Sequence, residues 1–483
     1  MAALFCLGML LYFVITLRAR STGGRELVKL LWLIYFALGL SAMFIAATDV
    51  LRPVYPPNYL AALFLLACVL VSISGFLAFH AKSVAAMIGS IRRQSLIEGI
   101  LIGSQFYATL YFLPFAIASL LGDANENRLD LANKMEQLGS YGIFNTLAGA
   151  ASQLFGASLI FACVRLAQPE GRGRSTARAS MLIAASLSYV IYILAYVGRD
   201  GVVYWLMTAL AVFVVFRPHI PRNMCQRIVA LGMAIASLLL LPFVAITVAR
   251  FVDTDYGSAW SVLDYFGSQI HNFSDYSSIE RPLTLGISNF PMFGGALCSA
   301  LGISCDNLAD LKEVIFGQYL AQNKEPWLFG TYVSDFVGDF GYLGTLVFLS
   351  AVAVLSHYAC RTQGGSRPPS ISRFLLIMFL FLVPYWGVFY FRWSIINGFI
   401  VVNLAFIAFV HFAQRGGGRR GRGARVGQRE RHYSPNRPLG RPDSLGSSSL
   451  DLEEEPRVDA DHARRAESST WRAQRVVRLA RWT

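Results

Sequence analysis

Two apolar segments joined by four residues decide the fold of this chain: ASMLIAASLSYVIYILAYV (residues 179–197), GRDG (198–201) and VVYWLMTALAVFVVF (202–216). Each segment is long enough to cross the hydrocarbon core of a bilayer as a helix, if tilt and flanking residues are allowed. The stretch therefore predicts two consecutive membrane-spanning helices that are connected by a tight, charged turn.

The same pattern recurs from the N-terminus to residue 412 and predicts an all-α polytopic membrane protein. The composition agrees, because 55% of the residues are hydrophobic and the mean hydropathy is +0.49. We expect eleven spans, at 1–17, 28–48, 59–80, 96–121, 141–164, 179–197, 202–216, 228–248, 330–357, 374–391 and 393–412.

Arginine and lysine residues set the expected orientation. The loops between the spans alternate between basic and nearly free of Arg and Lys, and basic loops stay cytoplasmic. This alternation predicts an external N-terminus and a cytoplasmic C-terminus. The net charge of +13 comes from these loops and the tail, so it does not indicate nucleic-acid binding. The basic loops hold Arg18, Arg20, Arg25 and Lys29; Lys82, Arg92 and Arg93; Arg165, Arg172, Arg174 and Arg178; Arg217, Arg222 and Arg227; and Arg361, Arg367 and Arg373.

Two external segments and a tail complete the expected organisation. Residues 122–140 form one external loop, and residues 249–329 form a larger, aromatic-rich loop between spans 8 and 9. Aromatic residues at this density suit helices that lie on the bilayer or a carbohydrate-binding surface. Cys298 and Cys305 in this loop are permitted to form a disulfide. Residues 1–414 make the membrane domain, and residues 415–483 read as a disordered, basic cytoplasmic tail.

Arginines at the external membrane boundary are the expected anion-binding groups. Arg199 lies in the four-residue turn, where a charged group needs a partner or a ligand, and its planar fork suits phosphate or diphosphate oxygens. The alternative is that Arg199 pairs with Asp200 or a lipid headgroup and merely caps the hairpin. Arg250 ends the eighth span and Arg281 lies within the large loop; an interfacial anchor and a pairing with Glu280 are their respective alternatives.

Three further side chains are candidates for acid–base chemistry. His271 lies in the large external loop and is a candidate general base, although a lone loop histidine is more often a surface residue. Asp335 and Asp339 are four residues apart and so share one helix face, where they alternatively complement a helix N-terminus. The chain has no P-loop, CxxC pair, HExxH or GxSxG, so we expect no nucleotide cofactor. We also expect no metal, because arginines can neutralise a diphosphate and the external segments hold no tight cluster of oxygen ligands.

Three segments together resemble one family. The sequence GRDGVV (198–203) resembles the Arg-containing turn of O-antigen polymerases. YFGSQIHNF (265–273), with the glycine-rich stretch 286–302, resembles the large external loop of the oligosaccharide repeat-unit polymerases. The stretch 332–344, with its DFGYLG core (339–344), resembles the signature that follows that loop. The resemblance extends in layout over residues 1–412.

The resemblance implies a glycosyltransferase of GT-C type in the bacterial inner membrane. Such an enzyme transfers a glycan from undecaprenyl diphosphate to the hydroxyl of a lipid-linked repeat unit, without metal. Arg199, Arg250 and Arg281 would stabilise the departing diphosphate, and His271, Asp335 or Asp339 would accept the hydroxyl proton. The resemblance implies an undecaprenyl-diphosphate-linked oligosaccharide as the substrate. It also allows a chain-length regulator and a flippase as partners in the membrane.

Three other functions stay open on the sequence. An O-antigen ligase would share the fold and the donor but use a lipid A core as acceptor. A lipid-linked oligosaccharide flippase would carry charges in mid-membrane and repeated halves. A scaffolding membrane protein would leave Arg199 and the aromatic loop without a role.

Overall fold

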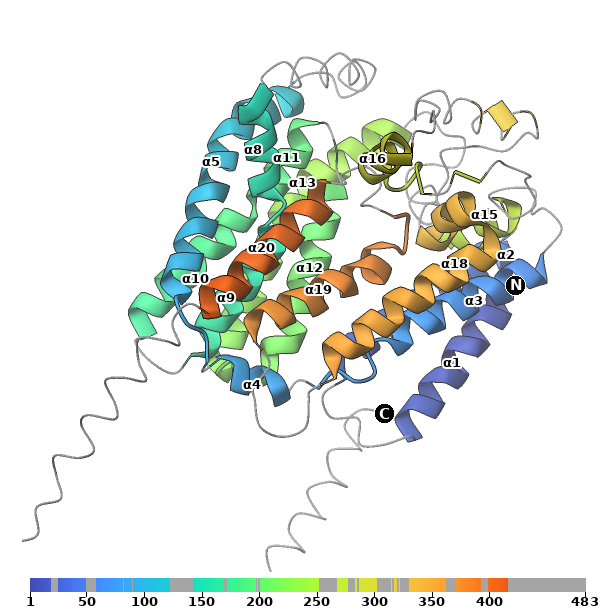
Figure 1. Cartoon of the computed structure of the whole chain (residues 1–483), viewed down its shortest axis with the longest axis horizontal. Helices are drawn as coiled ribbons and strands as arrows, with labels where there is room; N and C mark the ends of the chain where they lie inside the picture. The colour runs from blue at the N-terminus through green and yellow to red at the C-terminus, as the bar shows by residue number, and fades with distance from the viewer. Residues whose placement is uncertain are drawn as a thin grey trace, which may run out of the picture. The chain divides into compact units, whose positions relative to one another are not determined.

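In the computed structural model, the described residues form helices and the segments that connect them, without any strand (Figure 1). The described residues are 1–18, 25–48, 58–80, 82–88, 90–121, 142–168, 172–196, 198, 200–251, 267–276, 283–284, 286–301, 314, 317–318, 321, 330–361, 370–391 and 398–415. The expected external loop 122–140, most of the larger loop, Cys305 and the tail 415–483, apart from Arg415, lie outside these residues.

Each of the eleven segments expected to span a membrane contains helix. In chain order the helices are α1 (Ala2–Arg18), α2 (Glu26–Thr48), α3 (Tyr59–Ser74), α4 (Lys82–Ile88), α5 (Gln94–Leu121), α8 (Gly142–Ser152), α9 (Phe155–Ala167), α10 (Arg172–Ser186), α11 (Ser188–Ala195), α12 (Asp200–Phe216), η1 (Arg217–His219), α13 (Arg222–Phe251), α15 (Gln269–Tyr276), α16 (Pro291–Leu301), α18 (Thr331–Cys360), α19 (Ile371–Trp386) and α20 (Gly398–Arg415).

Several of these helices are membrane-spanning by length and composition. Within the described residues, α2, α5, α10 with α11, α12, α18 and α20 are long and apolar enough to cross a bilayer, and the bent pair α8–α9 would make a seventh span. Large apolar side chains point outward from the bundle, as Leu60 (79% exposed) and Leu343 (77% exposed) do. Lipid stabilises such a surface, whereas water does not. The chain is therefore an all-α membrane protein.

Two of the spans that differ from their expected form bear on the site. The span expected at 141–164 is broken at Gln153 and Leu154, where α8 and α9 meet at 41°. The span expected at 374–391 ends at Trp386, because Gly387 caps α19 and donates its N–H to the Val383 carbonyl at 3.1 Å. The chain then continues to residue 391 without helix and lies against the start of α18.

Helix α19 occupies the centre of the bundle, and Figure 1 shows it between α12 and α18. All of its side chains except Arg373 and Leu376 are buried. On one side of α19, α18 packs along α3, and α1 packs against α2 and α3; on the other side, α5 packs against α8, α9, α10 and α11. The Tyr35 hydroxyl of α2 donates to the Pro384 carbonyl at 2.6 Å, which pairs one of the free carbonyls in the last turn of α19.

Candidate functional site

The start of α18 is bound to the segment that follows α19. The backbone N–H groups of Thr331 and Tyr332 donate to the carbonyls of Phe389 (2.9 Å) and Gly387 (2.8 Å). The first N–H groups of a helix have no partner within the helix, so these carbonyls satisfy two of them. Thr331 has a φ of +72°, which is costly for a β-branched residue and is held by these contacts.

Asp335 continues this junction one turn further along α18. Its Oδ2 accepts a hydrogen bond from the backbone N–H of Phe391 at 2.6 Å, and the side chain remains partly exposed. The rings of Phe336 and Phe391 lie close by at a tilt, with centroids 4.7 Å apart, and the Phe290 ring of the large loop lies 5.2 Å from the Phe391 ring. These rings form an apolar surrounding on one side of the Asp335 carboxylate, which strengthens electrostatic interactions with it.

Asp339 holds part of the large loop against α18. It is fully buried; Thr284 Oγ1 donates to its Oδ1, and the Asn289 N–H donates to its Oδ2 at 3.0 Å. The Asn289 side chain also donates to the Asp335 carbonyl at 2.8 Å. Both oxygens of the Asp339 carboxylate therefore have donors, and the segment 284–289 is fixed to the helix by two residues.

The residues that follow Asp339 break the helix. Gly341 has φ +67° and ψ −178°, a conformation that is essentially restricted to glycine, so α18 consists of two helical parts. Phe340 precedes the break and stacks on Phe348 at 5.5 Å. The Asp-Phe-Gly sequence thus supplies a loop anchor, an aromatic contact and a break at three consecutive positions.

The charged turn between α11 and α12 contacts the same segment. Tyr390 donates its hydroxyl proton to Asp200 Oδ2 at 2.9 Å. A Cβ atom on Gly198 or Gly201 would come within 2.6 Å of the Ile193 side chain, so both glycines are required for the close approach of the turn to α11. Because Tyr390 and Phe391 are consecutive, Asp200 and Asp335 are connected through two neighbouring residues.

His271 lies on α15, which packs against α2, α3 and α18. Its Nε2 is 3.2 Å from the carbonyl oxygen of Ala42 in α2, so the histidine ties the loop helix to that span. Ser274 Oγ accepts the N–H of Asn58 at the start of α3 at 3.1 Å. These contacts place α15 at the end of the bundle where α2 finishes and where α3 and α18 begin.

The side chains of the three candidate arginines lie outside the part of the chain that the structure describes. Arg250 is helical in its backbone as the penultimate residue of α13, and its side chain lies outside the described part. Arg199 and Arg281 lie outside the described residues altogether, although Gly198 and Asp200 on either side of Arg199 are described. In the described part of the chain, no three His, Cys, Asp or Glu side chains are grouped as metal ligands would be.

Four residues of the site were not identified from the sequence. Thr284 and Asn289 are polar residues in an apolar stretch of the loop, which was a usable signal, whereas Tyr390 lies in an expected span. A tyrosine at the end of a span commonly has a polar partner for its hydroxyl. Phe391 contributes its backbone, for which residue type gives no signal.

No protein-family model, curated protein or solved structure matches the chain, so the description of this site rests on its own residues and their geometry. The arrangement offers a partly exposed carboxylate at Asp335, a second carboxylate at Asp200 beside Arg199, and a buried carboxylate that fixes the loop. A carboxylate in an apolar surrounding can accept a proton from a hydroxyl group.

Proposed function

We propose that the protein polymerises polyprenyl-diphosphate-linked oligosaccharide repeat units into a surface polysaccharide on the external face of a bacterial inner membrane. One observation carries this proposal: α18 holds three segments together. The segment 387–391 bonds to the start of α18 and, through Tyr390, to the turn at Asp200. Asn289 of the large loop bonds to Asp339 of the same helix. The turn, the loop and the start of α18 are the segments in which the sequence resembles repeat-unit polymerases, and their junction supports one shared site.

The proposed reaction is a glycosyl transfer without metal. The acceptor hydroxyl oxygen forms a bond to the anomeric carbon of the growing glycan, and the bond from that carbon to the diphosphate breaks. Asp335 accepts the hydroxyl proton, because its side chain is partly exposed and lies where α18 meets the segment 387–391. Arg199, with Arg250 and Arg281, stabilises the charge on the departing diphosphate.

The remaining candidates have other roles in this proposal. Asp339 is a positioning residue, since it is buried and both oxygens hold the loop segment 284–289. His271 is the alternative base, brought to the same end of the bundle by α15. The helices make eleven crossings in a GT-C arrangement, with the N-terminus outside and the C-terminus in the cytoplasm.

The test uses purified full-length protein, reconstituted with lipid-linked repeat units, and polymer length is read on a gel. Arg199→Ala should abolish polymer formation, and Arg199→Lys should restore only part of it, because a point charge replaces a bidentate fork. Excess EDTA should leave the wild-type activity intact. Normal polymer from the Ala variant at equal protein level would remove Arg199 from the site.

A deletion strain distinguishes the proposal from a ligase. Loss of the polymerase should leave single repeat units on the cell surface and no long chains. If polymer instead accumulates on its lipid carrier and is missing from the lipid A core, the protein is a ligase and the acceptor in the proposal is wrong.

A further inference from the structure

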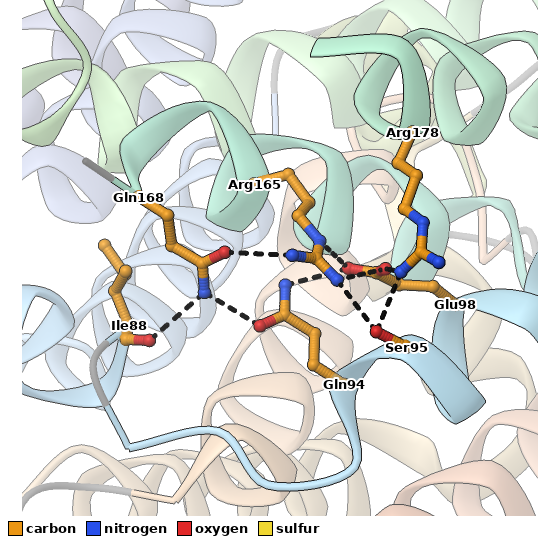
Figure 2. A network of polar contacts seen from close by, with 7 residues as sticks. All are labelled: Ile88, Gln94, Ser95, Glu98, Arg165, Gln168 and Arg178. Atoms are coloured by element: carbon orange, nitrogen blue, oxygen red, sulfur yellow. Dashed lines mark hydrogen bonds and ion pairs between the residues drawn. The ribbon is translucent and has the colours of Figure 1, made fainter. Parts of the chain in front are cut away.

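A second group of polar side chains, with the buried Glu98 at its centre, lies where α5 begins and α9 ends (Figure 2). Glu98 of α5 is 1% exposed and accepts two hydrogen bonds from Arg165 of α9, from Nε at 2.6 Å and from Nη2 at 2.8 Å. This bidentate arrangement is the strongest geometry for an arginine–carboxylate pair. The charges of Glu98 and Arg165 are thus matched one to one.

Arg178 of α10 is a second guanidinium at the same carboxylate. Its Nη1 is 3.7 Å from Glu98 Oε2 and donates to the hydroxyl of Ser95 at 2.7 Å, as Figure 2 shows. The Arg178 side chain is 37% exposed, compared with 18% for Arg165. Two guanidinium groups share one carboxylate, so the group carries an excess positive charge, and Arg178 is its more exposed part.

Two glutamines hold this arrangement in place without adding charge. Gln94 donates to Glu98 Oε1 at 2.8 Å, and Gln168 donates to Gln94 Oε1 at 2.8 Å and to the Ile88 carbonyl at 3.5 Å (Figure 2). The network therefore connects α4, α5 and α9, and the positive charge of Arg178 sits on a fixed support.

The surrounding chain increases the positive charge. Residues 82–98 and 165–178 contain seven basic and two acidic residues, Glu98 and Glu170, of which Glu170 lies outside the described residues. Helix α10 begins with Arg172 and has no acidic residue in its first turn. A helix N-terminus is itself a positive end, so basic residues there are unfavourable unless an anion is present.

Exposed apolar side chains lie next to the charged group. Leu96 follows Ser95 on α5 and is 53% exposed, and Met181 lies three residues after Arg178 on α10 and is 56% exposed. Residues three apart on a helix share a face, so Arg178 is followed directly by a lipid-facing side chain. A ligand with a charged head and an apolar tail fits this combination better than a free ion does.

We infer that the surface formed by Arg178 and Ser95 binds the phosphate headgroup of an anionic lipid, with the acyl chains along Leu96 and Met181. The guanidinium and the hydroxyl supply donors to the phosphate oxygens, and the anion neutralises the charge that Glu98 leaves uncompensated. This site is independent of the proposed transferase activity and lies on different helices from the Asp335 site.

Native mass spectrometry of the full-length protein tests the inference, with phosphatidylglycerol titrated against phosphatidylcholine. Arg178→Gln should weaken retention of phosphatidylglycerol about fivefold, the factor expected for one basic residue at an anionic surface. Arg227→Gln is the matched control, because Arg227 is exposed on α13 and makes the same charge change away from the network. Arg178→Lys should keep part of the retention.

The second measurement is thermal unfolding of the wild-type protein in lipid nanodiscs. Phosphatidylglycerol should raise the unfolding temperature of the wild type more than that of Arg178→Gln, and inorganic phosphate should not replace it. Equal loss in Arg178→Gln and Arg227→Gln would show general surface attraction and overturn the site. Equal stabilisation by inorganic phosphate in phosphatidylcholine discs would overturn the lipid as its ligand.

Discussion

Tyr390 donates a hydrogen bond at 2.9 Å to Asp200, which lies 190 positions earlier in the chain. The next residue, Phe391, donates its backbone N–H to Asp335 at 2.6 Å. The position of the charged turn relative to α18 therefore depends on two consecutive residues in the segment after α19. Changes to this segment should alter the relation between Arg199 and Asp335 without removing either side chain.

Tyr390→Phe is expected to lower the rate of polymer formation about tenfold while the protein remains folded and inserted. The variant loses one hydrogen bond to a charged group, an interaction worth roughly 1.5–3 kcal/mol. The measurement is the initial rate with lipid-linked repeat units. Asp200→Ala should lower the rate similarly, and the double variant should be no slower than the slower single variant, since both remove the same contact. Additive losses would show that the two residues act separately.

Asp335→Asn and Asp339→Asn should fail in different ways. Asp335→Asn should reduce turnover by about a hundredfold or more with little change in stability, because it removes the proposed base. Asp339→Asn should destabilise the fold by roughly 1–3 kcal/mol, because the new NH2 group would face a donor whose hydrogen bond the carboxylate oxygen accepted. Turnover and unfolding in detergent measure the two effects. A stable, inactive Asp339→Asn variant, together with an active Asp335→Asn variant, would exchange the two roles.

Gly341→Ala is expected to destabilise the protein by about 1–3 kcal/mol, since φ +67° with ψ −178° is strained for any residue with a Cβ atom. Unfolding in detergent is again the measurement. Gly103→Ala is the matched control, because Gly103 lies inside α5 and a Cβ atom there meets no atom within 4 Å. The control should be neutral or slightly stabilising, since alanine favours a helix. Equal effects in both variants would mean that the break is not required.

The sequence predicted the helices of the bundle better than it predicted their ends and contacts. Apolar length located α2, α5, α12 and α18 because a bilayer demands a continuous apolar segment. The end of α19 at Trp386 was not predictable, because it depends on carbonyls at 387 and 389 that pair with α18. Tyr390 was hidden inside an expected span, because its partner lies in a distant part of the chain.

Charge counting had a similar limit. Arg165 and Arg178 were read as loop charges that set the orientation, and that orientation remains a prediction. The structure shows in addition that both contact Glu98, which is buried in α5. Counting charges cannot distinguish a solvated residue from a buried pair, since both contribute equally to the loop total. The candidates His271, Asp335 and Asp339 were identified by residue type, but their partners required the fold.

Glu98→Gln should be among the most destabilising single changes in the membrane domain, by about 3–5 kcal/mol, because it leaves the Arg165 guanidinium without its buried partner. Unfolding in detergent measures this loss. Glu98→Gln with Arg165→Gln should recover part of the stability, since the double variant has neither member of the pair. Arg227→Gln, which removes an exposed charge, should change stability by less than about 0.5 kcal/mol. If the two single effects simply add in the double variant, the interaction between Glu98 and Arg165 contributes nothing to stability.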